Sequence, residues 1–173
     1  MKLFYLILIC IFPIISSAQS SDVKEKIENS NIYSEDALKE IKFSIDKIES
    51  CENSRSVDFV QSCRRDVSNS LDLAKNKINH AKNEANSIKE KATEISCSEL
   101  EEQADKAKAY FHDAESKISD ALGELYKVKY AKNLSKLNLH LSIANDNINQ
   151  ASIRINYAVN EMQNTLVTHE NCD

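Results

Sequence analysis

One repeat constrains the fold of this chain more than any other feature. Between residues 67 and 95, small or branched apolar residues recur at alternating steps of four and three. The repeat consists of Val67, Leu71, Ala74, Ile78, Ala81, Ala85, Ile88, Ala92 and Ile95. A period of three and a half residues places them on one side of a long helix and is typical of helices that pack side by side. The repeat therefore predicts an antiparallel bundle or coiled coil, and it predicts no reaction.

Two later segments carry the same repeat. Its members are Leu100, Ala104, Ala107, Phe111, Ala114, Ile118, Ala121, Leu125 and Val128, and then Leu134, Leu137, Leu141, Ala144, Ile148, Ala151, Ile155, Ala158 and Met162. The phase changes between the two segments, which indicates either a turn at residues 130–133 or a stutter within one long helix. We expect the turn, because a continuous helix from Ser98 to Thr168 would leave a long unpaired rod.

The segment over residues 22–50 follows the repeat less regularly. Its apolar members in one phase are Ile27, Leu38, Ile41, Ile45 and Ile48. Asn31 and Ser34 interrupt them, and Ser34 could cap a shorter helix that starts there. Before the helix expected over residues 99–129, Ser98 followed by Glu101 has the pattern of a capping box.

Few residues in the chain can break a helix. Proline occurs only at Pro13 and glycine only at Gly123, so tight hairpins between strands are not expected. The expected fold is all-α: an antiparallel up-down four-helix bundle of long amphipathic helices with coiled-coil-like seams. The expected helices cover residues 22–50, 57–95, 99–129 and 134–167.

The first eighteen residues have the pattern of a secretory signal peptide. Lys2 precedes an apolar run from Leu3 to Ile15, and Ser16 to Ala18 supplies the small residues that a signal peptidase recognises. We expect cleavage after Ala18, a single bundle domain over residues 19–173, and secretion into the extracellular space. No later stretch approaches the roughly twenty apolar residues of a membrane span.

Four cysteines follow the expected signal peptide: Cys51, Cys63, Cys97 and Cys172. An even number in an exported domain of this size predicts two disulfides. In an up-down bundle Cys51 and Cys63 lie at one end, whereas Cys97 and Cys172 lie at the other. We therefore expect the pairs Cys51–Cys63 and Cys97–Cys172. A metal site is the alternative, but the paired Cys-x-x-Cys spacing of zinc ligands is missing.

The sequence contains no recognisable catalytic motif. His80, His112, His140 and His169 lie in separate segments without the spacing of metal ligands, and we expect them to be solvent-exposed. A single glycine after the leader leaves no Gly-rich phosphate loop and no nucleophile elbow. We therefore expect a protein that is not an enzyme and needs no cofactor or metal. The net charge of −5 argues against a nucleic-acid partner.

The expected fourth helix carries apolar residues on the face opposite its core seam. Leu139, Ile143, Ile153 and Tyr157 lie there at helical spacing. Such a stripe could bind an extracellular protein, form a homodimer or face a lipid surface. The alternative is that the first helix covers it.

The expected third turn concentrates other surface features. Lys127, Lys129, Lys132 and Lys136 cluster there, which fits either an anionic surface or a solvated helix end. Asn133, followed by Leu134 and Ser135, forms a glycosylation sequon that we expect to be exposed.

A secreted four-helix bundle whose first two cysteines, Cys51 and Cys63, join an N-terminal helical hairpin resembles the plant invertase and pectin methylesterase inhibitors. Cys172 departs from that pattern because it follows the last helix. The chain is also similar in class to small helical proteins of arthropod saliva or venom. The expected function is a secreted, non-enzymatic binding protein, such as a salivary or venom effector or inhibitor acting on an extracellular protein. The alternatives are a lipid carrier of the exchangeable-apolipoprotein type and an enzyme inhibitor like the plant proteins.

Overall fold

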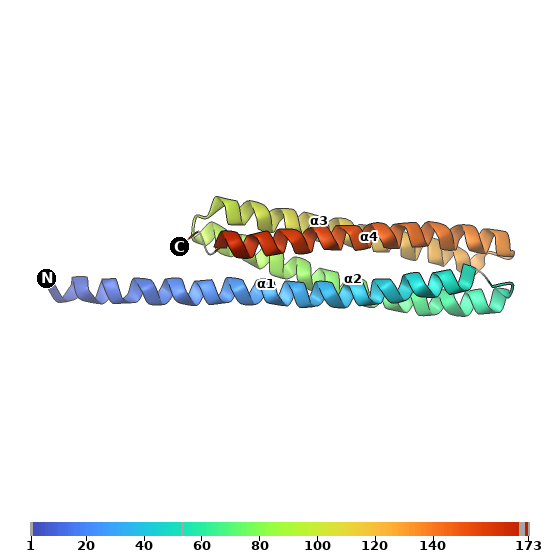
Figure 1. Cartoon of the computed structure of the whole chain (residues 1–173), viewed down its shortest axis with the longest axis horizontal. Helices are drawn as coiled ribbons and strands as arrows, with labels where there is room; N and C mark the ends of the chain where they lie inside the picture. Colours follow the sequence, from blue (N-terminus) through green and yellow to red (C-terminus); the bar gives the residue numbers. More distant parts are fainter. Residues whose placement is uncertain (1, 53, 170–171, 173) are drawn as a thin grey trace.

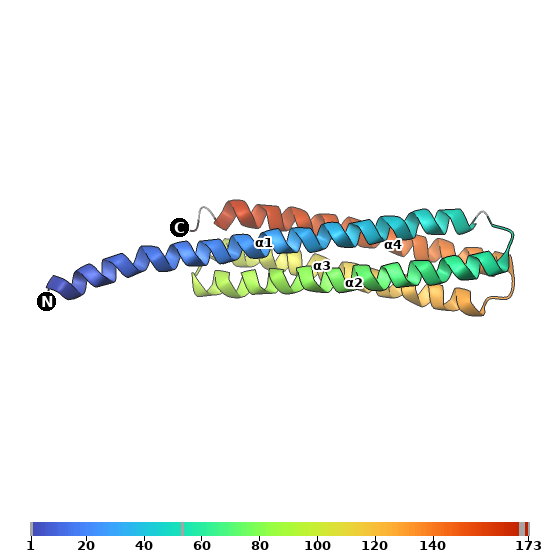
Figure 2. The same cartoon turned by 90° about the horizontal axis from the view of Figure 1, so that it is seen from below.

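The computed structural model describes residues 2–52, 54–169 and 172, and the side chains of residues 21–52, 54–169 and 172. Its helices are α1 (Lys2–Glu52), α2 (Val57–Glu94), α3 (Ser98–Tyr130) and α4 (Leu134–His169). Consecutive helices run antiparallel and form one elongated bundle (Figures 1 and 2). Every regular element of this described part is a helix, which confirms the predicted all-α, up-down four-helix bundle.

The regular repeats form the core of the bundle. Every member of the repeat in α3 is buried, as are those of α2 up to Ala92 and those of α4 from Leu137 onward. Ile95 and Leu134, at the ends of their repeats, are partly buried. Alanine at eleven of these positions lets neighbouring helices approach closely, so the core is narrow and filled by side chains.

The core seam of α1 differs from the predicted one. Ser30, Ser34 and Ser44 are fully buried in it, whereas Leu38 and Ile45 pack at its edge. The helix also continues through residues 31–34 without the break that the polar patch allowed. Buried serine is tolerated because its hydroxyl can donate to the carbonyl one turn earlier. Ser34 Oγ lies 2.7 Å from the Ser30 carbonyl oxygen, and Ser44 Oγ lies 2.9 Å from that of Glu40.

The turn between α2 and α3 corrects another expectation. Cys97, not Ser98, is the residue that precedes α3, and its side chain makes no capping hydrogen bond, so the predicted capping box is wrong. The reason is the compact exit from α2. Ser96 has φ 58°, and the Cys97 and Ser96 amides donate to the carbonyl oxygens of Ala92 and Thr93. This is a Schellman motif with serine where glycine is usual, and α3 begins directly after it.

The third turn is confirmed. Residues 131–133 lie outside the helices, between the end of α3 and the start of α4. A change of direction here lets α4 return along α3 (Figure 1). The stutter in one long helix is therefore excluded.

Both predicted disulfides are confirmed. Cys51 is bonded to Cys63 and Cys97 to Cys172, with Cα–Cα distances of 6.3 and 6.1 Å. The first bond clips α1 to α2 beside their connecting turn. The second ties the α2–α3 turn to the segment after α4, so the α3–α4 hairpin is covalently closed at both ends. Among the described side chains of α1, the disulfide-bonded one is Cys51, near the C-terminal end of the helix.

The N-terminal part of α1 extends beyond the ends of the other three helices (Figures 1 and 2). The helix passes without interruption through the expected signal peptide and beyond the expected cleavage site after Ala18. The side chains of that peptide lie outside the described residues. A helix with the length and apolarity needed to cross a membrane is not found in the described part of the chain.

Candidate functional site

Among the described residues, α4 carries more exposed large apolar side chains than any other helix. Leu139, Ile143, Ile153 and Tyr157 have exposed fractions of 57%, 38%, 50% and 47%. The core residues of α4 occupy the opposite side of the helix, since they lie about half a turn away around its axis. We call these four residues the outer stripe. The alternative that α1 covers the outer stripe is wrong.

The outer stripe consists of two apolar pairs. Leu139 and Ile143 form one, Ile153 and Tyr157 form the other, and Asp146 and Gln150 lie between them on the same face. The two pairs are separated by ten residues, or about 15 Å of helix. The Tyr157 ring packs against Tyr110 of α3 with centroids 5.5 Å apart. One anchor of the stripe is therefore held in place by the neighbouring helix.

The two flanks of α4 differ in their electrostatics. On the α3 side, Lys127 and His140 both bond the Glu124 carboxylate, at 2.5 and 2.8 Å. These bonds, from Lys127 first and then from His140, hold the pKa of Glu124 below its usual value. On the α1 side, burial and then the charges of Glu49 and Asp146 raise the pKa of Glu52. Glu124 therefore has favourable partners on the α3 flank, whereas like charges lie close together on the α1 flank.

The four lysines near the third turn do not form one surface. Lys127 and Lys129 are two residues apart on α3, so their side chains leave the helix in nearly opposite directions. Lys127 is paired with Glu124, and Lys129 Nζ lies 5.4 Å from the centroid of the Tyr130 ring. Lys132 and Lys136 are exposed beyond them. This arrangement is that of a solvated helix end.

Asn133 begins α4. Its Oδ1 accepts a hydrogen bond from the Lys136 amide at 2.9 Å, and its carbonyl oxygen accepts one from the Leu137 amide. The residue is exposed, as expected for a glycosylation site. Sequence reasoning missed this N-cap role, although asparagine before an apolar repeat is a common signal for it.

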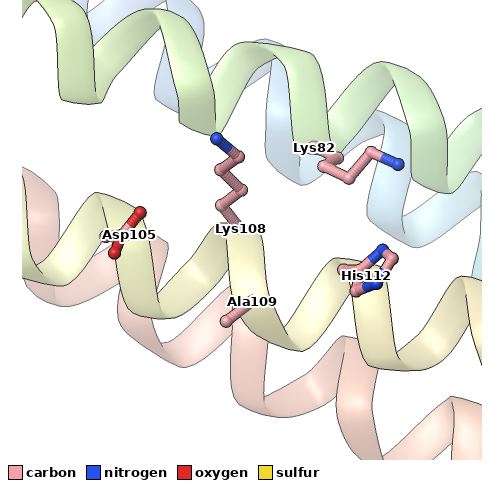
Figure 3. A pocket seen from close by; sticks show the side chains of 5 residues that line it. All are labelled: Lys82, Asp105, Lys108, Ala109 and His112. Carbon is pink, nitrogen blue, oxygen red and sulfur yellow. The ribbon is translucent and has the colours of Figure 1, made fainter.

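In the described part of the chain, surface grooves lie between neighbouring helices. One, of about 350 Å³, lies between α2 and α3 and is lined by Lys82, Asp105, Lys108, Ala109 and His112. Figure 3 shows Lys108 extending from α3 towards α2. Its Nζ lies 2.6 Å from Asn86 Oδ1, while Lys89 pairs with Asp105 at 2.7 Å. Because Lys108 and Asp105 of α3 both bond to side chains of α2, the groove has the contacts of a helix interface.

The second groove, of about 410 Å³, lies on the outer side of α1 and α2. Phe43 of α1 and Leu73 of α2 supply its apolar part, and Lys39, Asp66 and Asn69 are among its polar lining residues. Sequence reasoning missed it because Phe43 and Leu73 belong to different helices. It is a local patch, whereas the outer stripe follows one helix for about 27 Å.

The histidines do not converge. His80 and His112 are exposed as expected, but His140 is half-buried against Glu124 and His169 is buried, so exposure was wrong for these two. In the described part of the chain, no group of three or more His, Cys, Asp or Glu residues could hold a metal ion.

The chain matches no protein-family model, and neither the curated proteins nor the solved structures include a match to it. Its function must therefore be argued from the outer stripe and the bundle that presents it.

Proposed function

We propose that the protein is a secreted, non-enzymatic binding protein that recognises an extracellular protein through the outer stripe of α4. The observation that carries this proposal is the exposure of Leu139, Ile143, Ile153 and Tyr157 on one face of a long helix. The bundle core is complete without them. Exposed apolar residues that lie outside the buried core and follow one line often mark an interaction surface.

The scaffold suits recognition by a rigid helix face. Anchors at helical spacing on an amphipathic helix fit a hydrophobic groove on a partner. The α3–α4 hairpin is closed at both ends, by its turn and by the Cys97–Cys172 bond. A pre-formed helix loses little conformational entropy when it binds. An effector or inhibitor of saliva or venom, or an enzyme inhibitor, would use such a surface.

Secretion and glycosylation belong to the same proposal. The leader pattern before Ala18 and the two disulfides are compatible with an oxidising, extracellular environment. A glycan on Asn133 would leave Oδ1 free to cap α4, because N-glycosylation uses Nδ2. Expression in a secretory eukaryotic cell should yield a protein that begins at Gln19 and loses mass with a glycosidase. Ser135→Ala should abolish that loss, and an intracellular product with an intact leader would contradict secretion.

The binding surface is tested by capture experiments with matched variants. Wild-type protein, an Ile143→Asp/Ile153→Asp variant and an Ile32→Asp/Phe43→Asp control are immobilised and exposed to the extracellular fluid in which the protein accumulates. Ile32 and Phe43 are also exposed, but on α1. Captured proteins are identified by mass spectrometry, and binding is measured again with the purified candidate.

The α4 variant should lose at least tenfold in affinity for the purified candidate, whereas the α1 control should bind as the wild type does. Circular dichroism should show the same helicity in all three. Equal binding by the α4 variant would overturn the assignment to the outer stripe.

A lipid carrier is the second candidate, and the construction of α1 favours it. Its seam contains three buried serines, and among its described side chains the disulfide lies at the C-terminal end, at Cys51, so the preceding part of α1 is the most easily separated from the other helices. Release would expose apolar seams that could lie on lipid. Liposome flotation tests this candidate with intact and with reduced protein, and absence of binding in both states rejects it.

A further inference from the structure

The outer face of α4 has the same order of residue types in both chain directions. Its positions are 139, 143, 146, 150, 153 and 157, separated by steps of four, three, four, three and four. They are symmetric about Ile148. Leu139 corresponds to Tyr157, Ile143 to Ile153, and Asp146 to Gln150. Apolar positions therefore mirror apolar ones, and the polar positions mirror each other.

This symmetry matches what an antiparallel pair of identical helices requires. In a two-fold interface, if residue i contacts residue j of the second copy, then j also contacts i of that copy. Centred on Ile148, antiparallel packing places Leu139 on Tyr157 of the second copy and Ile143 on its Ile153. Asp146 lies beside Gln150. The four-three spacing is also that of a helix–helix seam.

The charges beside this seam support the antiparallel direction. Asp146 lies within the seam and Arg154 beside it, and among the described residues neither forms an ion pair. In antiparallel packing, Arg154 lies about 6 Å, measured along the helix axis, from Asp146 of the second copy. The two-fold symmetry forms this contact twice. In-register parallel packing would instead place Asp146 against Asp146. Charge complementarity of this kind selects one orientation.

We propose that the protein forms a two-fold dimer in which α4 packs antiparallel against α4 of a second copy through the outer stripe. This proposal rests on the part of the proposed function that makes the outer stripe a binding surface, and it names a second copy of the chain as the occupant. The apolar contact extends for about 27 Å of helix. Such a contact is smaller than a standard interface of about 1,600 Å², so the dimer should be weak and concentration-dependent.

The test uses charge reversal and analytical ultracentrifugation of the full mature chain. Asp146→Arg leaves two positive residues at each contact, and Arg154→Glu leaves two negative ones. Each variant alone should dimerise at least tenfold more weakly than the wild type. An equimolar mixture of the two should recover a dimer, because each contact then joins opposite charges. The double variant should dimerise by itself for the same reason.

Matched controls on α2 are Arg65→Glu and Asp72→Arg, which reverse exposed charges away from α4 and should leave the dimer unchanged. A wild-type protein that stays monomeric up to several hundred micromolar would overturn the proposal. So would dimerising variants whose mixture shows no gain over each alone, since that pattern requires another interface.

The outcomes also separate this inference from the proposed function. A monomeric wild type that still loses its extracellular partner on Ile143→Asp/Ile153→Asp substitution would reject the dimer and retain the binding surface. A dimer disrupted by charge reversal, with foreign-protein binding unaffected by the Ile143→Asp/Ile153→Asp change, would retain the dimer and reject foreign recognition at this face.

Discussion

The neighbouring helices α1 and α4 distribute apolar residues between core and surface in opposite ways. In α1, three serines are buried in the core seam, and the hydroxyls of Ser34 and Ser44 bond to carbonyls of the helix itself. In α4, the core seam is apolar from Leu137 to Met162, and four more apolar residues lie on the opposite face. In its described part, α1 places serine at three core positions although Ile32 and Phe43 are exposed on it, whereas α4 fills its core seam with apolar residues and also exposes the outer stripe.

The difference teaches where to look for function in a regular bundle. A core seam tolerates any small or apolar side chain that keeps the spacing and satisfies its own polar atoms, so its regularity reports structure. The outer stripe of α4 contributes nothing to that seam. Its apolar residues are therefore the part of the pattern that folding does not explain.

The largest predicted effect concerns the covalent ties. Cys97→Ser/Cys172→Ser opens a loop with a sequence separation of 75, and Cys51→Ser/Cys63→Ser one with a separation of 12. The chain-entropy model gives losses of about 4.5 and about 2.8 kcal/mol in the free energy of unfolding. Chemical denaturation measures both. A larger loss for the Cys51–Cys63 bond would contradict the view that α4 is the more firmly tied helix.

The next effect compares the two faces of α4. Ile148→Ala removes a fully buried side chain and should cost about 2–5 kcal/mol in stability. Ile153→Ala, in the outer stripe, should change stability by no more than about 0.5 kcal/mol. Thermal or urea unfolding of the two variants decides this. Similar losses would mean that the outer stripe also contributes to folding.

A smaller effect is expected when serine in the core seam of α1 is replaced by alanine and alanine in that of α4 by serine. Ser34→Ala in α1 should stabilise the protein by about 0.5 kcal/mol, because alanine has the higher helix propensity and the Ser30 carbonyl keeps its backbone bond. Ala144→Ser in α4 should destabilise it by a similar amount. Urea midpoints provide the measurement, and a destabilising Ser34→Ala would show that the hydroxyl is required in α1.

The smallest effects come from the flanks of α4. The pKa of Glu124 is lowered, so this residue contributes stability above its unfolded pKa that is lost as the pH falls through its folded pKa. Glu124→Gln should therefore cost roughly 0.5 kcal/mol at pH 7 and less in acid. Stability curves between pH 7 and pH 3 measure this dependence. A pH-independent cost would refute the ion-pair explanation.

The opposite sign is expected on the α1 flank. The pKa of Glu52 is raised, so its ionised form destabilises the fold at neutral pH, and this penalty disappears as the pH falls through its folded pKa. Glu52→Gln should stabilise the protein by roughly 0.3 kcal/mol at pH 7 and by nothing in acid. The same pH series would show a loss at pH 7 if Glu52 instead had a favourable partner.

Much of this architecture could be predicted from the sequence, since three of the four seams obey one period and the bundle topology fixes the cysteine pairs. The phase of the α1 repeat could not be predicted. Leu38 and Ile45 are more hydrophobic than Ala37 and Ser44, so hydrophobicity alone favours the wrong positions for the core. The predicted disulfide at Cys51 could have indicated the correct phase. Cys51, Ile48, Ser44 and Ile41 lie at the spacing that the α1 seam has in the structure. The left-handed backbone conformation of Ser96 could not be predicted either, because no glycine marks the turn.

The outer stripe could be located from the sequence, but its exposure could not. Whether α1 lies over Ile143 or beside it depends on how four helices arrange around one core, which a single helix pattern does not specify. The basic cluster shows the reverse case. Lys127 and Lys129 are close in sequence but diverge in space, because successive residues of α3 turn by about 100°, and Lys132 and Lys136 lie in the turn and on the next helix.

Hydroxyl-radical footprinting of the protein measures use of the outer stripe most directly. Oxidation rates of Leu139, Ile153 and Tyr157 are compared between dilute protein, concentrated protein and protein in its natural fluid, with Ile32 and Phe43 of α1 as internal references. We expect the α4 residues to become protected at high concentration or in the fluid, while the α1 residues keep their rates. Protection confined to α1, or unchanged rates on α4 under every condition, would contradict a binding role for the outer stripe.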